Sequence, residues 1–216
     1  MPISIPVPDW PVLVAFSFAV AILNITPGPD MTYQINRALV EGRRAAFVAL
    51  AGTNTGFAVH VLLAAFGVSA LIAASPTAYS VLKYVGAFYL LWLAVQAIRT
   101  GSRLDIQTEG KPCQSDQQTF LAAIMINILN PKVILFFVTF LPQFVSANDG
   151  DAGGKLIFLS LYALVFSLLV SVPLLFVITR FLGALKNNKR ILRVIDYVFA
   201  GVFGAFAARI LLSRPA

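Results

Sequence analysis

The segment Asn24-Ile25-Thr26-Pro27-Gly28-Pro29-Asp30 interrupts an apolar run that begins at Trp10. A proline has no backbone N–H and its ring clashes with the preceding helical turn, so two prolines around a glycine predict a broken helix. In the second half of the chain, Asn127-Ile128-Leu129-Asn130-Pro131-Lys132 interrupts another apolar run in a similar way. We therefore expect two helices of this protein to be broken at comparable positions.

The composition is that of an integral membrane protein. The 216 residues are 59% hydrophobic and only 12% charged, with a mean hydropathy of +0.85. Soluble proteins carry about 25% charged residues, so a soluble fold of this length could not hide so much apolar surface. Disorder is excluded because disordered chains are poor in aromatic residues, which here reach 12%. With about 20 residues per span, the chain has room for about six helices and no extramembrane domain.

The apolar runs predict an all-α integral membrane fold. Each run is apolar on every face, whereas the strands of a membrane β-barrel alternate in polarity. Met1–Trp10 contains no Lys or Arg, so the first run lacks the basic start of a signal peptide and is expected to stay in the mature protein. The expected spans are Trp10–Thr26, one span within Ala45–Ser80, and about Thr77–Ile98, Thr119–Val145, Leu156–Thr179 and Val194–Leu212.

Positive charges are concentrated in alternate connections between the expected spans. Arg37–Arg44, Arg99–Asp116 and Arg180–Arg193 together hold eleven of the 16 Lys and Arg residues, whereas Ala73–Thr77 holds none and Ser146–Lys155 holds one. Connections rich in Lys and Arg stay in the cytoplasm, so both termini are predicted to lie outside it. The net charge of +7 therefore reflects membrane topology, and we expect no nucleic-acid partner.

Short similarities indicate that the two halves of the chain are related. Val81–Val85 resembles Val194–Val198, and each opens the last span of its half. The two proline-containing breaks are the second similarity. We expect a first three-helix repeat over residues 1–100, a cytoplasmic connecting loop over 101–117 and a second three-helix repeat over 118–216. Because three spans is an odd number, the second half has to insert upside down, which gives a 3+3 inverted repeat.

Broken helices at equivalent positions of two repeats indicate a transport site, because freed backbone groups are tolerated in a membrane only beside protein or a wet cavity. A plainer alternative is that Pro27-Gly28-Pro29 ends the first span at the membrane surface, with Arg37–Arg44 following on that surface. The alternative accounts poorly for the second break, where Lys132 is the one charge between Gln117 and Asn148. A lysine there is costly without a partner or water.

Three ionisable residues are the leading candidates for such a site. Asp30 follows the first break, where a half-helix N-terminus favours a carboxylate; it either binds a substrate amine, couples protons or faces the interface. Lys132 either meets a substrate carboxylate, neutralises Asp30 or snorkels to the surface. His60 shares a helix face with Gly52 and Gly56, which suits close helix packing, and it either relays protons or bonds a neighbouring carbonyl.

Asparagine side chains near the breaks are further candidates. Each offers two donors and an acceptor, which suit a zwitterionic amino acid or freed backbone groups equally well. Asn54 lies one turn from the His60 face and adds a polar contact. The residues expected to bind substrate or couple protons are Asn24, Thr26, Pro27, Gly28, Pro29, Asp30, Asn54, His60, Asn127, Asn130, Pro131 and Lys132.

The sequence has no constellation typical of an enzyme. It lacks a His pair at metal-binding spacing, a glycine-rich phosphate loop and a Gly-x-Ser-x-Gly motif, so we expect no catalysis, no metal site and no cofactor. Without a nucleotide site, transport has to draw on an ion gradient. The expected partners are a small-molecule substrate, protons and the lipid bilayer, and homo-oligomerisation is left open.

Two other function classes are compatible with the sequence. One is a membrane-embedded scaffold or assembly factor that transports nothing. Intramembrane Asp30 and Lys132 argue against it, because a scaffold has no need of charges that are costly to bury. The other is an exporter of a small ion or metal, against which the scarcity of acidic residues in the spans argues.

Further short motifs accompany the two breaks. They are Glu41-Gly42-Arg43-Arg44, Gly86-Ala87-Phe88-Tyr89-Leu90 and Phe140-Leu141-Pro142-Gln143-Phe144. In their order and spacing, these motifs resemble the lysine exporter (LysE) superfamily over nearly the whole chain, and most closely its homoserine/threonine exporter (RhtB) branch. The resemblance implies six helices in the inner membrane, with the first and fourth broken, and export of an amino acid or similar metabolite by proton antiport. Related thiol-electron carriers need paired cysteines, whereas this chain has only Cys113.

Overall fold

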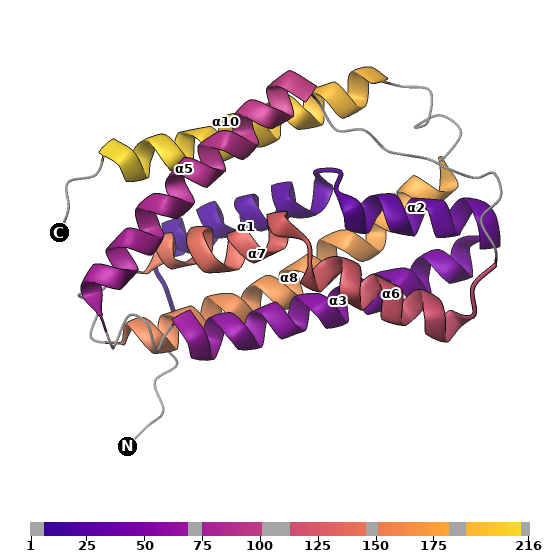
Figure 1. The fold of residues 1–216 in the computed structure, drawn as a ribbon, viewed down its shortest axis with the longest axis horizontal. Coiled ribbons are helices and arrows are strands. Elements are labelled where there is room, and N and C mark those ends of the chain that lie inside the picture. Colours follow the sequence, from indigo (N-terminus) through magenta and orange to yellow (C-terminus); the bar gives the residue numbers. More distant parts are fainter. Residues whose placement is uncertain (1–6, 69–74, 101–112, 146–150, 182–188, 213–216) are drawn as a thin grey trace.

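The computed structural model describes residues 7–68, 75–100, 113–145, 151–181 and 189–212, and the regular structure within these ranges is entirely helical (Figure 1). The expected all-α fold is thus confirmed for this part of the chain. The elements are α1 (Trp10–Ile25), α2 (Pro29–Glu41), α3 (Arg43–Leu63), the π-helical η1 (Ala64–Val68), α5 (Pro76–Thr100), α6 (Asp116–Ile128), α7 (Pro131–Leu135), the π-helical η2 (Phe136–Phe140), the 3₁₀ turn η3 (Leu141–Phe144), α8 (Ala152–Arg180) and α10 (Lys189–Leu212).

Both expected breaks are present. The axes of α1 and α2 differ by 46°, and those of α6 and the helical stretch Pro131–Phe144 differ by 47°. Pro29 and Pro131 each occupy the first position of the helix that follows the break. A proline is well placed there because its fixed φ suits a helix start and its missing N–H has no partner within the helix.

The number of membrane spans is settled only in part. Arg43–Gly67 and Ala152–Arg180 are each long and apolar enough to cross a membrane, and two more spans result if each bent pair crosses as one unit. α5 and α10 contain shorter apolar stretches, Tyr84–Arg99 and Asp196–Ala205. The described part of the chain therefore supports two to four spans, and the six-helix 3+3 repeat stays a prediction.

The expected connection Arg37–Arg44 is wrong. α2 continues to Glu41 and α3 begins at Arg43, which leaves Gly42 as the single linking residue. Gly42 has a φ of 87°, a conformation that a residue without a Cβ adopts easily. Arg37 extends the helix rather than a surface loop because it pairs with Glu41 one turn later, and it is only 3% exposed.

Two glycines bring α3 and α6 into close contact. A Cβ added at Gly56 would lie 2.8 Å from the Cβ of Asn127, and one added at Gly52 would clash with the backbone oxygen of Phe120. The close-packing face expected from the sequence is therefore confirmed. The next residue on this face is His60, which is thereby placed against the end of α6.

An aromatic core fills the molecule on the Trp10 side of the breaks. The ring of Phe16 in α1 packs 6.0 Å from that of Phe136 and 5.0 Å from that of Phe144. Phe140 then links this cluster to Phe203 of α10 at 5.1 Å. These rings pack as tilted and edge-to-face pairs, which are favourable aromatic geometries. This half of the molecule is therefore densely filled.

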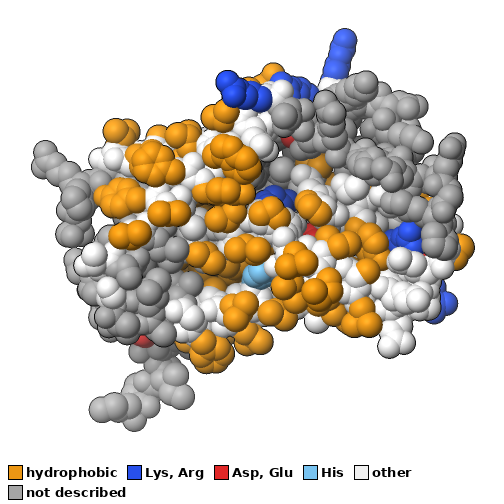
Figure 2. Space-filling model, viewed as in Figure 1, with side chains coloured by type: hydrophobic (Ala, Val, Ile, Leu, Met, Phe, Trp, Pro, Cys, Tyr) orange, Lys and Arg blue, Asp and Glu red, His pale blue; other side chains and the backbone are white. Residues whose placement is uncertain are grey.

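The helices form a bundle crossed by a separate pair. α5 and α10 pack together and pass over α1 and α7, while α2, α3, α6 and α8 lie beneath them in this view (Figure 1). Hydrophobic side chains cover much of the described part of the face shown in Figure 2, with Lys and Arg side chains mainly at its margins. An apolar surface of this kind suits contact with lipid tails.

Candidate functional site

The two breaks contact each other through Asp30 and two asparagines. The Oδ2 atom of Asp30, in the first turn of α2, accepts hydrogen bonds from Nδ2 of Asn127 at 3.0 Å and Nδ2 of Asn130 at 2.7 Å. Asn127 lies in the last turn of α6, and Asn130 is the N-cap of α7. A carboxylate from the first half of the chain is thus held by amides from the second, and the dipole of α2 favours its negative charge.

Lys132 fills a hydrogen-bonding vacancy that Pro27 creates in α1. In a regular helix the carbonyl of Leu23 accepts the N–H of residue 27, which a proline lacks. The Nζ atom of Lys132 donates to this carbonyl at 2.9 Å and to the carbonyl of Thr26 at 2.9 Å. Gly28 leaves room for the ammonium, since a Cβ there would lie 3.3 Å from Nζ.

His60 plays the corresponding part at the second break. Pro131 leaves the carbonyl of Asn127 without its usual helical donor, and Nε2 of His60 lies 3.2 Å from that oxygen. A carbonyl oxygen only accepts, so Nε2 carries the hydrogen in this contact. The ring also stacks on Phe137, with centroids 5.7 Å apart. Of the two roles that the sequence left open for His60, this geometry corresponds to the hydrogen bond to a neighbouring carbonyl.

Asp30 and Lys132 line the same cavity but do not form an ion pair with each other. Each is instead held by groups from the opposite half of the chain, Asp30 by side-chain amides and Lys132 by backbone carbonyls. The alternative in which Lys132 neutralises Asp30 is therefore compatible with the structure as an electrostatic interaction between the two groups, but not as a direct hydrogen-bonded pair. Each break is thus stabilised by hydrogen bonds from the other break.

A cavity between the breaks has about 60 Å³ open to the centres of water molecules, which is room for several waters at roughly 10–15 Å³ each. The expected residues that line it are Asn24, Thr26, Asp30, Asn54, Asn127 and Lys132. The other expected residues form the breaks themselves or support the lining residues, and they are Pro27, Gly28, Pro29, His60, Asn130 and Pro131.

Several polar residues of the cavity wall were not expected from the sequence. Ser167 of α8 donates to Oδ1 of Asn24 at 2.8 Å, and Ser171 lines the cavity one turn later. Gln34 of α2 donates to Thr53 of α3 at 3.1 Å. Two serines at i and i+4 in a very apolar helix were a usable sign of a polar stripe in α8.

The rest of the cavity wall is apolar. Its hydrophobic lining includes Met31, Leu50, Phe57, Leu174 and Ile178, contributed by α2, α3 and α8. The cavity therefore combines a charged and amide-rich end at the breaks with an apolar side. Within the described ranges, no three His, Cys, Asp or Glu residues lie together in a way that would hold a metal ion.

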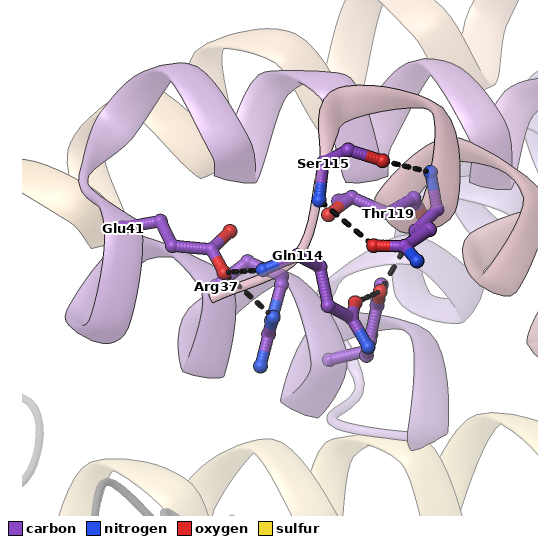
Figure 3. Close-up of polar contacts among 7 residues, drawn as sticks. Arg37, Glu41, Gln114, Ser115 and Thr119 are labelled. Atoms are coloured by element: carbon purple, nitrogen blue, oxygen red, sulfur yellow. Dashed lines mark hydrogen bonds and ion pairs between the residues drawn. The ribbon is translucent and has the colours of Figure 1, made fainter. Parts of the chain in front are cut away.

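The far end of α2 is tied to the segment before α6 (Figure 3). Oε1 of Glu41 accepts hydrogen bonds from Arg37 at 2.9 Å and from the backbone N–H of Gln114. The hydroxyl of Tyr33 donates to the side-chain oxygen of Gln114 at 2.8 Å. No local pattern predicts this network, because Gln114 is distant from its partners along the chain. The network lies at the same end as the exposed Arg43 and Arg44.

Comparison with known proteins identifies the family of this chain. Residues 21–214 match the family described as LysE type translocator. The chain belongs to the LysE family. The resemblance seen in the sequence motifs is thus confirmed. Membership in a translocator family also agrees with a cavity enclosed between two broken helices.

Several relatives match over most of their length. The chain is 28% identical to a homoserine/homoserine lactone efflux protein of Salmonella typhi, covering 94% of this chain and 97% of the relative. It is 29% identical to a leucine efflux protein of Klebsiella pneumoniae, covering 86% and 88%, and 30% identical to a Bacillus subtilis membrane protein, YrhP, covering 82% and 88%. These names agree with the RhtB branch. No solved structure gives a significant match.

Proposed function

We propose that the protein is a secondary transporter that exports a small amino acid or related metabolite from the cytoplasm by proton antiport. The observation that carries this proposal is the cavity between two reciprocally braced helix breaks in a member of a translocator family. Broken helices let backbone and side-chain groups meet a polar substrate inside a membrane without exposing them to lipid.

The chemistry of the cavity supports a small amphipathic substrate. Asp30 and Lys132 offer opposite charges at one end, and residues such as Leu50 and Leu174 offer an apolar wall at the side. An amino acid has both kinds of group. The relatives named for efflux of homoserine, homoserine lactone and leucine point to the same substrate class. Which amino acid is carried is the first question for experiment.

The placement of the cavity supports uptake of substrate from the cytoplasm. On α8 the cavity is lined by Ser167 to Ile178, toward the basic end at Arg180, whereas Phe158 and Tyr162 belong to the aromatic half. The basic end is the cytoplasmic one by the positive-inside rule. A cavity toward the basic end, with aromatic rings filling the other half, supports an exporter that takes up its substrate from the cytoplasm.

The proposed orientation places both termini outside the cytoplasm, with the chain in the inner membrane. In Figure 1, α1 begins and α10 ends on the left, and the α2–α3 turn with its basic residues lies at the opposite end. A phosphatase or fluorescent reporter fused after Ala216 tests this arrangement. Fluorescence without phosphatase activity, the behaviour of a cytoplasmic terminus, would contradict it.

The alternative functions make different predictions. A scaffold would have no use for a partly buried Asp30 and Lys132 held by groups across the two halves, since each charge is costly in a membrane. An exporter of metal ions would need a cluster of ligands, and the described residues offer none. The amino-acid exporter is the reading that uses both charges and the cavity together.

A metabolite assay tests the proposal directly. Cells that overproduce the protein should excrete one or more amino acids and tolerate toxic levels of them, while Asp30→Asn should reduce both effects to the level of cells without the protein and leave membrane insertion intact. Thr55→Val is the matched control, because Thr55 is exposed and bonds only the carbonyl of Ala51 in its own helix. Unchanged tolerance and unchanged excretion with the wild type would contradict export, and protection against a metal ion instead would favour the ion exporter.

A further inference from the structure

The two oxygens of the Asp30 carboxylate are in different situations. Oδ2 receives both amide hydrogen bonds, from Asn127 and Asn130. Oδ1 is buried and has no hydrogen-bond donor among the described residues. Buried polar atoms in folded proteins nearly always have a partner, and a charged acceptor without one is especially unfavourable. Oδ1 therefore indicates a donor that is absent from the chain itself.

A second unpaired acceptor lies on the neighbouring side chain. Within the described ranges, Oδ1 of Asn127 is also buried without a donor, although its Nδ2 is bonded to Asp30. A proton on Oδ1 of Asp30 would convert one acceptor into a donor and remove the negative charge. An ammonium group on a ligand would supply donors and leave the carboxylate charged. Both a proton and an amine thus satisfy what this site lacks.

The other titratable groups that face Asp30 already have partners. Lys132, from α7, gives two of its three N–H groups to the carbonyls of Leu23 and Thr26. His60, from α3, donates Nε2–H to the carbonyl of Asn127. Both side chains therefore already use N–H donors to hold carbonyls at the helix breaks. Asp30 is the titratable group of the cavity wall whose unmet hydrogen-bonding capacity suits a mobile proton.

Given the proposed export function, we infer that Oδ1 of Asp30 holds either a proton or the ammonium group of the substrate, and that this competition couples export to proton entry. At the cytoplasmic side, the substrate R–NH₃⁺ binds as the protonated carboxyl group loses its proton to water, which gives –COO⁻···⁺H₃N–R and a free proton. At the outer side, the ammonium leaves and an external proton rejoins the carboxylate. Each cycle moves one substrate out and one proton in, and no covalent bond other than O–H changes.

The competition makes substrate binding depend on pH in a defined direction. The ammonium needs the ionised carboxylate. At pH values below the pKa of Asp30 in the free protein, the apparent Kd of the substrate therefore rises tenfold for each pH unit. Binding in this range releases up to one proton per substrate molecule. The substrate amine is essential to both effects, since a neutral hydroxyl does not compete for the carboxylate charge.

Purified full-length protein in nanodiscs allows the test. The probes are L-homoserine, L-leucine and the other common L-amino acids, with leucinamide and 2-hydroxy-4-methylpentanoate as analogues that lack the carboxylate charge and the amine respectively. We expect an amino acid to bind with the stated pH dependence and proton release, leucinamide to compete with bound leucine, and the hydroxy acid to fail. Better binding of the hydroxy acid than of leucinamide overturns the inference and leaves export standing. Absence of binding by every amino acid overturns both.

Two variants distinguish Asp30 from His60 as the group that releases the proton. Asp30→Asn should abolish the pH dependence and the proton release, whereas His60→Gln, which keeps an N–H for the carbonyl of Asn127, should keep both. Loss of the pH dependence in His60→Gln together with its retention in Asp30→Asn assigns the proton to His60 and overturns the inference. A wild type that binds substrate with no pH dependence also overturns it.

Infrared difference spectra keep the inference testable if Asp30→Asn neither folds nor binds. In the wild type at acid pH, adding the amino acid should remove the C=O band of a protonated carboxyl group. Asn127→Ala should shift the position of that band, because its amide is bonded to the Asp30 carboxyl group. A wild-type spectrum that shows no loss of this band on binding overturns the inference whatever the variants do.

Discussion

The two breaks bend the chain by nearly the same angle, 46° and 47°, yet they are held in different ways. At the first break, the carbonyls of Leu23 and Thr26 depend on the single ammonium of Lys132 from the other half of the chain. At the second, Asn130 caps its own helix by accepting the N–H of Lys132 at 3.0 Å, and the carbonyl of Asn127 also receives the N–H of Asn130. The His60 contact is an addition to this local support.

Two bends of similar angle therefore differ in how strongly they depend on contacts from other segments. A break supported by its own cap keeps its shape when one outside contact is lost. At the first break, Thr26 bonds back to the carbonyl of Ile22, but the carbonyls of Leu23 and Thr26 rely on one side chain from a distant segment. The first break, which carries Asp30, is therefore the more sensitive of the two to the loss of a contact. Its geometry depends on how the two halves of the chain pack together.

The largest effect is expected at Lys132. Lys132→Gln should abolish export and lower the free energy of unfolding by about 1.5–3 kcal/mol, because hydrogen bonds from a charged group to two carbonyls are lost. Thermal unfolding of the purified protein and the excretion assay measure the two effects. Lys83→Gln is the lysine control and should be nearly silent, as an interfacial anchor would be; the side chain of Lys83 lies outside the described part of the structure. An essential Lys83 with a dispensable Lys132 would move the site to the span ends.

A double variant sharpens this prediction. Pro27→Ala restores the N–H that the carbonyl of Leu23 lacks, so Pro27→Ala combined with Lys132→Gln should recover about 1 kcal/mol of the lost stability relative to the sum of the single changes. Additive effects of the two changes would show that Lys132 does not act through this carbonyl. Export need not return, since Lys132 also lines the cavity.

An intermediate effect is expected at the close approach of α3 and α6. Gly56→Ala places a Cβ 2.8 Å from the Cβ of Asn127 and should cost about 1–3 kcal/mol of unfolding free energy by forcing the helices apart. Because Asn127 bonds Asp30, export should fall as well. The control is Gly67→Ala, where the structure shows nothing within 4 Å of an added Cβ. Equal stability of the two variants would contradict the packing described here.

The smallest effect is expected at His60. His60→Leu removes one hydrogen bond to a carbonyl that keeps a second donor, so stability should fall by about 1 kcal/mol, and His60→Gln should recover most of it. Both variants should export at more than trace levels. Loss of export in His60→Gln with unchanged stability would give His60 a direct part in transport and would contradict the difference drawn between the two breaks.

Much of the architecture was predictable from local sequence. Proline and glycine at the breaks act on the backbone of their own turn, so both bends could be expected at their observed positions. Long apolar runs likewise predicted the helices, with α8 found at Ala152–Arg180 against an expected Leu156–Thr179. The predicted connection Arg37–Arg44 is wrong because a charged residue also fits inside a helix when it has a partner, as Arg37 has in Glu41.

The polar wall of the cavity was predictable only in part. Residues next to a proline, such as Asp30 and Asn130, were predictable because the break beside them is visible in the sequence. Gln34 could not be predicted because a single polar residue in a helix has no local signature, and only the packing of α2, α3 and α8 shows that it reaches the same cavity as Ser171. The link from Glu41 to Gln114 was missed for the same reason.

By itself, the sequence determined that this is a helical membrane protein with two broken helices, because composition, apolar runs and proline chemistry act over a few turns of one segment, and its short motifs carried the resemblance to the LysE family. Only the tertiary structure decided how the breaks are satisfied: Lys132 completes α1, His60 contacts the end of α6, and Asp30 is held by Asn127 and Asn130. Those partners come from opposite halves of the chain. The physical reason is that a missing backbone donor specifies the need for a partner, and only the packing of distant segments specifies which side chain supplies it.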